Sequence, residues 1–246
     1  MGENNISKVL RLYEYVFDTY GNIKLCGRES CKDLIMACNS IYSSKDFGNI
    51  DTGFMKEDDI KCLVTKFKKY DYINLSLVKP NDLWLDSIYD FKSEFDVKSD
   101  ELGGFGGLDR LEPCEWIQFT KDLEDAEHKC PGYANSDQFM LVNVRLRRVL
   151  GLIQVRRELS TEVLKNYGGH IGYSIRKSDR LKGYGEYMLS LALKHCKSIG
   201  IEKVMVTCNV DNIGSRKMII GNGGKFSRRV IWEERSEEIE IYWINI

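Results

Sequence analysis

The fold is decided by residues 169–185, GHIGYSIRKSDRLKGYG, where an apolar strand runs into a basic turn punctuated by glycines. Residues 184–199 then place apolar side chains at helical spacing, so the turn opens a helix. Gly183 and Gly185 lack Cβ atoms, which lets the backbone approach a ligand closely. The first N–H groups of a helix have no intrahelical acceptors and lie at the positive end of its dipole. The pattern therefore predicts a turn that holds a phosphate or pyrophosphate.

The sequence on the C-terminal side of this turn predicts a continued alternation of strands and helices. A short apolar run at 204–208 suits a strand in a sheet interior, and residues 212–220 suit a second helix. Residues 226–232 and 239–244 alternate apolar and polar side chains, as half-buried strands do. These two runs should close the chain as neighbouring strands.

The sequence on the N-terminal side predicts the remainder of the same domain. Two β-rich runs separated by Arg147 and Arg148 indicate an antiparallel hairpin. The elements expected before residue 157 are strand 72–78, helix 82–95, helix 114–126 and strands 139–146 and 149–156. A glycine-rich loop at 103–107 joins the two helices, and it reads equally as a substrate lid or as a plain connector.

The first 69 residues differ from the rest. Residues 6–20, 30–42 and 56–69 show helical spacing of apolar side chains, separated by glycine-containing segments. We expect residues 1–69 to form a helical N-terminal extension and residues 70–246 to form the main domain. The sequence does not indicate what the extension does.

The composition narrows the class of protein. The chain has 37 acidic and 36 basic residues, so its charge offers no bulk attraction for nucleic acid or an anionic membrane. No apolar run reaches the roughly 18 residues of a membrane span, and the first residues are polar. The eight cysteines contain no C-x-x-C pair, and there are only three histidines. We therefore expect a cytoplasmic protein with reduced thiols and no metal, acting on small molecules or peptides.

Arg180, Gly183 and Gly185 match the phosphate-binding signature of the GNAT superfamily of acyl-coenzyme A dependent N-acyltransferases, which the segment resembles. The likeness extends to Gly172 and Tyr173 on the preceding strand and to other positions up to residue 226, and it covers roughly residues 70–246. The resemblance implies an α/β (α+β) fold. Its central sheet would be mixed, mostly antiparallel, and flanked by helices.

The resemblance also implies where acetyl-coenzyme A binds. Backbone N–H groups of the turn would meet the pyrophosphate, the charges of Arg180 and Lys182 would lie near the phosphates, and the backbone of Ile175 would meet the acyl arm. Asn209 and Asn212 would add polar contacts, although both also suit a turn and a helix N-cap. The cofactor-binding residues so predicted are Ile175, Arg180, Leu181, Lys182, Gly183, Tyr184, Gly185, Glu186, Asn209, Asn212 and Ser215.

The catalytic residues follow the family pattern only in part. Many members carry a tyrosine that protonates the leaving thiolate where this chain has Ile219, so water, Tyr173, the thiol's own acidity or another side chain must complete that step. His170 occupies the family's frequent base position, and imidazole titrates near neutrality. A strand histidine is also commonly structural or substrate-lining. Glu158 is the second candidate for the base.

The function implied is transfer of an acetyl group from acetyl-coenzyme A to a primary amine, by direct attack in a ternary complex. The acceptor is a small molecule or a peptide, and the protein is a monomer or a homodimer. The alternative is a non-catalytic coenzyme A sensor or interaction protein. A cluster of basic residues around the predicted hairpin is either a solvated surface or a site that attracts an acidic acceptor. Its members are Arg145, Arg147, Arg148, Arg156 and Arg157.

Overall fold

A computed structural model describes residues 74–96, 102–127 and 130–246 of the chain. The predicted helices before residue 70 lie outside these ranges, so the helical extension and its boundary stay predictions. The chain divides into two compact units, of which the larger comprises residues 76–142 and 147–246 and the smaller residues 1–75 and 143–146. The elements described below belong almost entirely to the larger unit.

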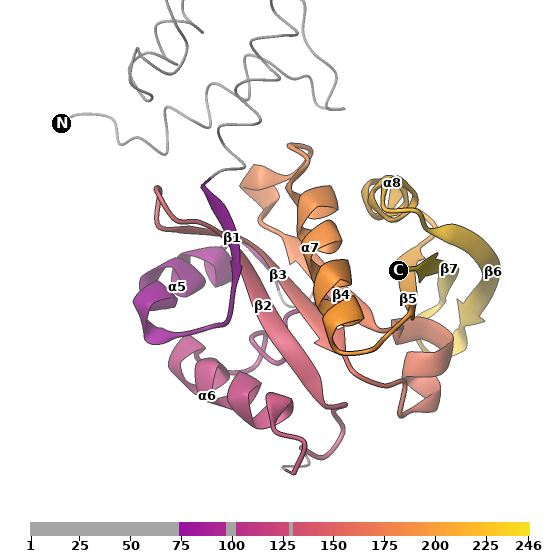
Figure 1. Cartoon of the computed structure of the whole chain (residues 1–246), viewed down its shortest axis with the longest axis horizontal. Coiled ribbons are helices and arrows are strands. Elements are labelled where there is room, and N and C mark those ends of the chain that lie inside the picture. Colours follow the sequence, from indigo (N-terminus) through magenta and orange to yellow (C-terminus); the bar gives the residue numbers. More distant parts are fainter. Residues whose placement is uncertain (1–73, 97–101, 128–129) are drawn as a thin grey trace, which may run out of the picture. The chain divides into compact units, whose positions relative to one another are not determined.

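Seven strands form one mixed sheet in the order β1-β2-β3-β4-β5-β7-β6 (Figure 1). The pairs β3–β4, β5–β7 and β6–β7 are antiparallel, whereas β4 and β5 run parallel. The strands are β1 Leu75–Val78, β2 Ser136–Asn143, β3 Arg148–Arg156, β4 Ile171–Ile175, β5 Lys203–Asn209, β6 Lys225–Trp232 and β7 Glu237–Asn245. This confirms the predicted mixed, mostly antiparallel sheet.

Helices cover both faces of the sheet. Leu152 of β3 belongs to a buried core with Ile88 and Trp116, whereas the neighbouring Gly151 lies against Met188 on the other face. Figure 1 shows α5 and α6 together beside β2, with α7 crossing in front of the sheet. The helices are α5 Leu85–Ser93, α6 Pro113–Glu124, α7 Tyr184–Ser198 and α8 Ile213–Gly221. Short 3-10 turns form η1 Asp82–Trp84, η3 Lys177–Asp179 and η4 Glu233–Arg235, and a π-helical turn forms η2 Leu164–Gly168.

The hairpin between β2 and β3 differs from the prediction. Strand β2 ends at Asn143 instead of residue 146, because the Asn143 side chain accepts the backbone N–H of Leu146 at 3.0 Å and starts a turn. Arg147 completes the reversal with a φ of 50°. The predicted strand at 171–175 and the helix at 184–199 are confirmed to within one residue. The π-helical turn at 164–168 was not predicted.

Three observations concern only the described residues. No helix among them is both long enough and apolar enough to cross a membrane. Within the same ranges, no group of three or more histidine, cysteine, aspartate or glutamate side chains is arranged to hold a metal ion. Four described cysteines are free thiols, namely Cys114, Cys130, Cys196 and Cys208.

Candidate active site

Strands β4 and β5 pair over a much shorter length than their neighbours do. Their register consists of one residue pair, Ile171 with Val206, whereas β5 and β7 pair over the whole of β5. The N–H of His170 donates to the carbonyl of Met205 at 2.8 Å just before that pair. The two parallel strands therefore pair at one end, at Ile171 and Val206.

The backbone groups of Tyr173 and Ile175 lie on the side of β4 that faces β5. The carbonyl of His170 accepts the N–H of Arg156 from β3, and the N–H of Arg176 donates to Leu150 of the same strand. Because successive residues of a strand point their polar groups to opposite sides, Tyr173 and Ile175 direct theirs toward β5. Arg180 Nε already reaches the Ile175 carbonyl at 3.3 Å. This places the predicted backbone of Ile175 at the open side of β4.

The glycine-punctuated turn begins α7 as the sequence predicted. Gly183 is the N-cap with a φ of 85°, a left-handed conformation that glycine adopts without strain, and it offers no side chain to the first turn. Leu181 also has a positive φ, 61°, and its side chain is exposed. The N-terminal end of this 15-residue helix carries the positive end of the dipole. It follows β4 in the chain, after the 3-10 turn η3.

Gly185 has a packing role that the sequence did not reveal. A Cβ atom at this position would lie 2.7 Å from the sulfur of Met218 on α8. The carboxylate of the next residue, Glu186, lies near Gly221 at the end of α8. The second glycine of the signature therefore lets α7 and α8 approach each other, while Gly183 provides the turn. Tyr184, between them, is buried.

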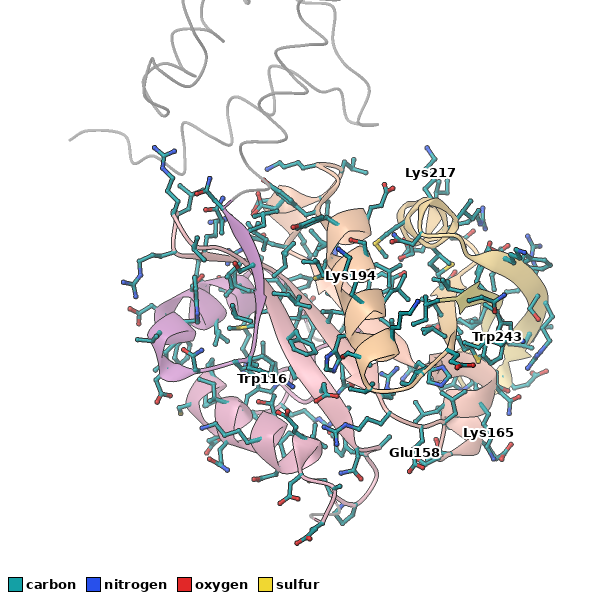
Figure 2. All side chains as sticks on the ribbon, viewed as in Figure 1. Trp116, Glu158, Lys165, Lys194, Lys217 and Trp243 are labelled. Atoms are coloured by element: carbon teal, nitrogen blue, oxygen red, sulfur yellow. The ribbon has the colours of Figure 1, made fainter. Side chains whose placement is uncertain are left out.

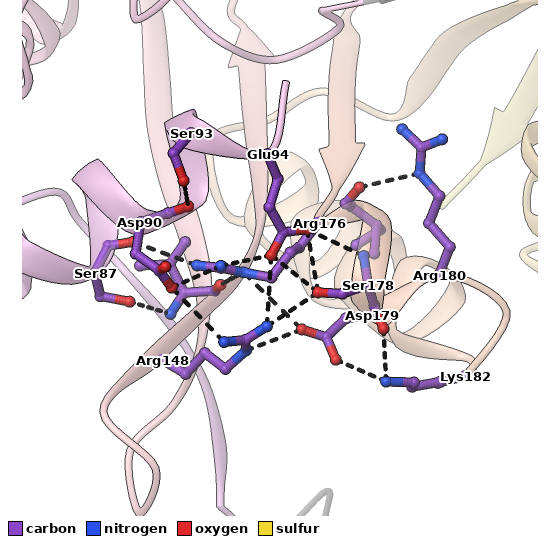
Figure 3. Close-up of polar contacts among 12 residues, drawn as sticks. Ser87, Asp90, Ser93, Glu94, Arg148, Arg176, Ser178, Asp179, Arg180 and Lys182 are labelled. Carbon is purple, nitrogen blue, oxygen red and sulfur yellow. Dashed lines mark hydrogen bonds and ion pairs between the residues drawn. The ribbon is translucent and has the colours of Figure 1, made fainter. Parts of the chain in front are cut away.

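Lys182 is held inside the turn. Its ammonium donates to Asp179 Oδ1 and to the Ser178 carbonyl, both at 2.8 Å (Figure 3). Asp179 is only 3% exposed. The charge of Lys182 therefore offsets that of a buried carboxylate, and direct contact with a phosphate stays a prediction. Arg180 projects away from this cluster in Figure 3, and its contact with a phosphate also stays a prediction.

A buried arginine connects the turn to α5. Arg176 is fully buried, and its guanidinium donates to Asp90 Oδ2 at 2.7 Å and to Glu94 Oε1 at 2.9 Å (Figure 3). Arg148 of β3 donates to Asp179 Oδ2 at 3.1 Å. The cluster therefore anchors the phosphate turn to a helix and a strand far away in the sequence. It was not predicted from the sequence, because Arg176 lies 86 residues from Asp90 and 82 from Glu94, and Arg148 lies 31 residues from Asp179.

Polar residues after β5 shape the start of α8. The Asn209 side chain accepts the N–H of Asp211, and the Asn212 side chain accepts the N–H of Ser215, both at 3.0 Å. Asn212 is thus the N-cap of α8. The structural roles expected of both asparagines are confirmed, and contacts of Asn209, Asn212 and Ser215 with a cofactor stay predictions.

His170 lies at the closed end of the β4–β5 pair and is partly buried. Its Nδ1 accepts the backbone N–H of Met205 at 3.0 Å, so the neutral ring carries its proton on Nε2. Burial lowers the pKa of this imidazole, and the nearby charge of Arg156 lowers it further. The ring is therefore neutral at pH 7 and presents an N–H donor on its free side.

The other residues considered for catalysis lie in different parts of the fold. Glu158 follows the end of β3 and is exposed (Figure 2). Tyr173 lies within β4, and its hydroxyl is buried. Ile219, at the family's tyrosine position, is fully buried and packs against Gly224. The acid and base assignments stay predictions.

The glycine-rich loop at 103–107 packs tightly on β4. Cβ atoms at Gly103 and Gly104 would lie within 2.7 Å of the backbone of Gly172 and Tyr173. Ser174 Oγ donates to the Gly103 carbonyl at 2.7 Å, and the buried Trp116 (Figure 2) donates to Phe105 at 2.8 Å. The loop is thus neither an open lid nor a loose connector. Its backbone lies against the backbone of Gly172 and Tyr173 on β4.

Residues 88–225, more than half of the chain, match the family described as acetyltransferase (GNAT) domain. The chain therefore belongs to the GNAT acetyltransferase family, and it is an acyltransferase. The fold and the position of the phosphate turn agree with this class. Comparison with curated proteins gives no match.

Solved structures with the same fold include acetyltransferases with different acceptors. The chain is 16% identical to the ribosomal L7/L12 α-N-protein acetyltransferase RimL in complex with coenzyme A, covering 70% of this chain and 94% of that one, with a TM-score of 0.53. Microcin C7 self immunity acetyltransferase MccE, in complex with acetyl-CoA and AMP, is 15% identical, with 70% and 93% coverage and a TM-score of 0.52. A spermidine N-acetyltransferase SpeG chimera from Vibrio cholerae and hSSAT is 13% identical, with 70% and 95% coverage and a TM-score of 0.50. These similarities concern the fold.

Proposed function

We propose that this protein transfers an acetyl group from acetyl-coenzyme A to a primary amine by direct attack in a ternary complex. The observation that carries the proposal is the single-pair register between β4 and β5, on the strand that precedes the glycine-punctuated turn of α7. A strand edge with available backbone groups suits an extended amide-containing arm. A helix N-terminus suits a pyrophosphate.

The residues present fit coenzyme A at several points. The left-handed Gly183 exposes the first turn of α7, and Arg180 supplies a positive charge beside it. The polar edge of Tyr173 and Ile175 would pair with the pantetheine amides, and one N–H there would stabilise charge on the acyl oxygen. The thioester supplies an activated acetyl group. Tyr184, Gly185 and Glu186 contribute the helix start, and Asn209, Asn212 and Ser215 line the start of α8.

The hydrogen bond of His170 bears on the proton transfers. Because Nδ1 accepts from Met205 and Nε2 carries the proton, the neutral imidazole can donate to the acceptor but has no free lone pair. We infer that His170 orients the acceptor, and that the amine loses its proton to water or to Glu158. Ile219 offers no proton, so water or Tyr173 would protonate the leaving thiolate.

The acceptor class is a small-molecule or peptide amine. By their names, structural neighbours act on a ribosomal protein and on spermidine. The monomeric or homodimeric state, the cytoplasmic location and the exclusion of nucleic acid and membrane stay predictions from the sequence.

The first test is calorimetric titration with acetyl-coenzyme A, with ATP and NAD as controls, followed by thiol release with a panel of amines. We expect selective binding and amine-dependent thiol release. Gly183→Ala should weaken binding. Gly200→Ala is the matched control, because Gly200 ends the same helix with a φ of 83° and no atom lies within 4 Å of its Cβ position. Binding without transfer to any amine would favour the coenzyme A sensor instead.

A further inference from the structure

The basic cluster around the β2–β3 hairpin separates into side chains with and without carboxylate partners. Arg148 forms ion pairs with Asp179, Asp90 and Glu94. Arg157 donates two hydrogen bonds to Asp137. Both are therefore neutralised within the fold.

Arg156, the last residue of β3, is different. Its Nη1 donates to the carbonyls of Gly168 and Gly169, both at 3.1 Å, and it forms no ion pair with a carboxylate of the described residues. Burial lowers the pKa of this guanidinium to about 10, so it remains charged at neutral pH. A guanidinium has five N–H donors in a planar fork, and the two carbonyls use only one nitrogen. No described residue accepts a hydrogen bond from its Nε or Nη2, so both can meet an anion.

The position of Arg156 places this charge at the candidate active site. Gln154 pairs with Gly172 across β3 and β4, and Arg156, two residues on, lies on the same face of the sheet. A Cβ atom on Gly172 would be 3.1 Å from Arg156 Nη2 and 2.9 Å from the N of Gly104. The guanidinium therefore lies over the β4 backbone, next to the Ile171 pair and beneath the glycine-rich loop. Its charge also reaches His170.

We propose that Arg156 binds a carboxylate of the acceptor, so that the acceptor is an acidic amine such as an amino acid or a peptide with a carboxylate near its amino group. The proposal rests on the proposed acetyl transfer. A partly buried cation that has no carboxylate partner among the described residues gains strongly from a carboxylate, because charge-assisted hydrogen bonds from guanidinium are short and can be bidentate. The same charge repels a polyamine at this point. Because Gly172 has no side chain, the guanidinium can approach the β4 backbone closely.

The first experiment compares matched acceptors on the wild-type protein. Each pair shares an amine and differs by one carboxylate: glycine with glycinamide, and amidated Ala-Glu and Ala-Asp peptides with amidated Ala-Gln and Ala-Asn. Spermidine is the cationic member of the panel. At least one carboxylate acceptor should show kcat/KM about tenfold or more above its amide partner, in line with a hydrogen bond to a charged group. Equal values in every pair, or preference for spermidine, would overturn the proposal.

The second experiment assigns the preference to Arg156. Arg156→Gln should remove the discrimination by raising KM for the acidic acceptor, with the Kd for acetyl-coenzyme A unchanged. Arg156→Lys should retain part of it. The matched control is Arg228→Gln, which removes the same charge from an exposed position on β6 and should change neither value. Loss of acetyl-coenzyme A binding in Arg156→Gln would instead assign the anion to the cofactor and reject the proposal.

The outcomes separate this proposal from the proposed function. Thiol release with several amines but without any carboxylate preference rejects the role of Arg156 and leaves acetyl transfer intact. Absence of transfer to every amine rejects both. Arg156→Gln also removes two hydrogen bonds to the backbone before β4, so its folding should be checked by circular dichroism. If Arg156→Gln does not fold, the matched acceptor pairs on the wild-type protein and the Arg156→Lys variant still test the proposal.

Discussion

Nδ1 of His170 accepts the backbone N–H of Met205 at 3.0 Å, and the backbone of His170 donates to the carbonyl of the same residue. One histidine thus makes a two-point connection between β4 and β5 just before the single Ile171–Val206 pair. The connection closes one end of the candidate acyl site and determines which imidazole nitrogen holds the proton. A residue selected as a candidate base is therefore also part of the framework of the sheet.

The pH dependence of turnover tests whether His170 is the base. Because its Nδ1 lone pair is occupied, we expect His170→Gln to lower kcat while the acid-limb ionisation of the pH–rate profile persists. Glutamine can still accept the Met205 N–H, which makes it a closer control than alanine. Loss of that ionisation in His170→Gln would instead establish the imidazole as the base.

The pKa of His170 should respond to Arg156. Burial and then the guanidinium charge hold this pKa below its ordinary value, so Arg156→Gln should raise it, because a nearby positive charge disfavours the imidazolium. NMR titration of the imidazole resonances measures the shift. Arg228→Gln is the control, since its guanidinium lies on the distant strand β6. An equal pKa in wild type and Arg156→Gln would contradict the electrostatic coupling.

Asp179 should stabilise both the fold and the phosphate turn. It is 3% exposed and meets Arg148, Arg176 and Lys182. Asp179→Asn should lower the free energy of unfolding by about 3 kcal/mol, since it removes the carboxylate of Lys182 and one of those that meet Arg148 and Arg176, and it should raise the Kd for acetyl-coenzyme A. Urea denaturation and calorimetry measure these effects. Asp90→Asn is the control, because that side chain is 59% exposed and its loss should cost less than about 1 kcal/mol. Equal losses of unfolding free energy in Asp179→Asn and Asp90→Asn would show that burial of Asp179 does not increase its contribution to stability.

Asp137 should make stability depend on acid pH. Burial opposes its ionisation, but hydrogen bonds from Arg157, Lys79 and His195 outweigh it and hold the pKa well below the ordinary value. The stabilisation is therefore complete above the unfolded pKa of about 3.9 and is lost as the pH falls toward the lower folded pKa. Asp137→Asn should be about 3–5 kcal/mol less stable than wild type at pH 7. The difference in unfolding free energy between wild type and Asp137→Asn should shrink below pH 4. A difference that does not change with pH would exclude stabilisation by the ionised Asp137 carboxylate.

Leu181 should be replaceable by glycine with a gain in stability. Its φ of 61° lies in the left-handed region, which costs a residue with a Cβ atom about 1 kcal/mol. Its side chain is exposed, so little packing is lost. We expect Leu181→Gly to raise the melting temperature slightly and to preserve acetyl-coenzyme A binding. A clear loss of stability would show that the unfolded-state entropy of glycine outweighs the relief of strain.

Local patterns in the sequence were sufficient to predict most of the described elements. Alternating apolar residues predicted the strands near 171–175 and 239–244, and helical spacing predicted α7, because each signal lies within one short segment. Gly183 was likewise identified by a local requirement, since only glycine adopts its φ of 85° without strain. The end of β2 was misplaced because one side-chain hydrogen bond, from Leu146 to Asn143, decides it.

By itself, then, the sequence determined the order of most described strands and helices, the glycine turn before α7 and the family resemblance. Only the tertiary structure decided what the polar side chains do. It showed that Arg148 and Arg157 are paired with carboxylates whereas Arg156 is bound to backbone carbonyls. It also showed that Lys182 donates to Asp179 and that the N–H of Met205 donates to His170. The physical reason is that charge and hydrogen-bond pairing depend on atoms brought within about 3 Å by folding, often from distant parts of the chain. No periodicity along the sequence records those distances.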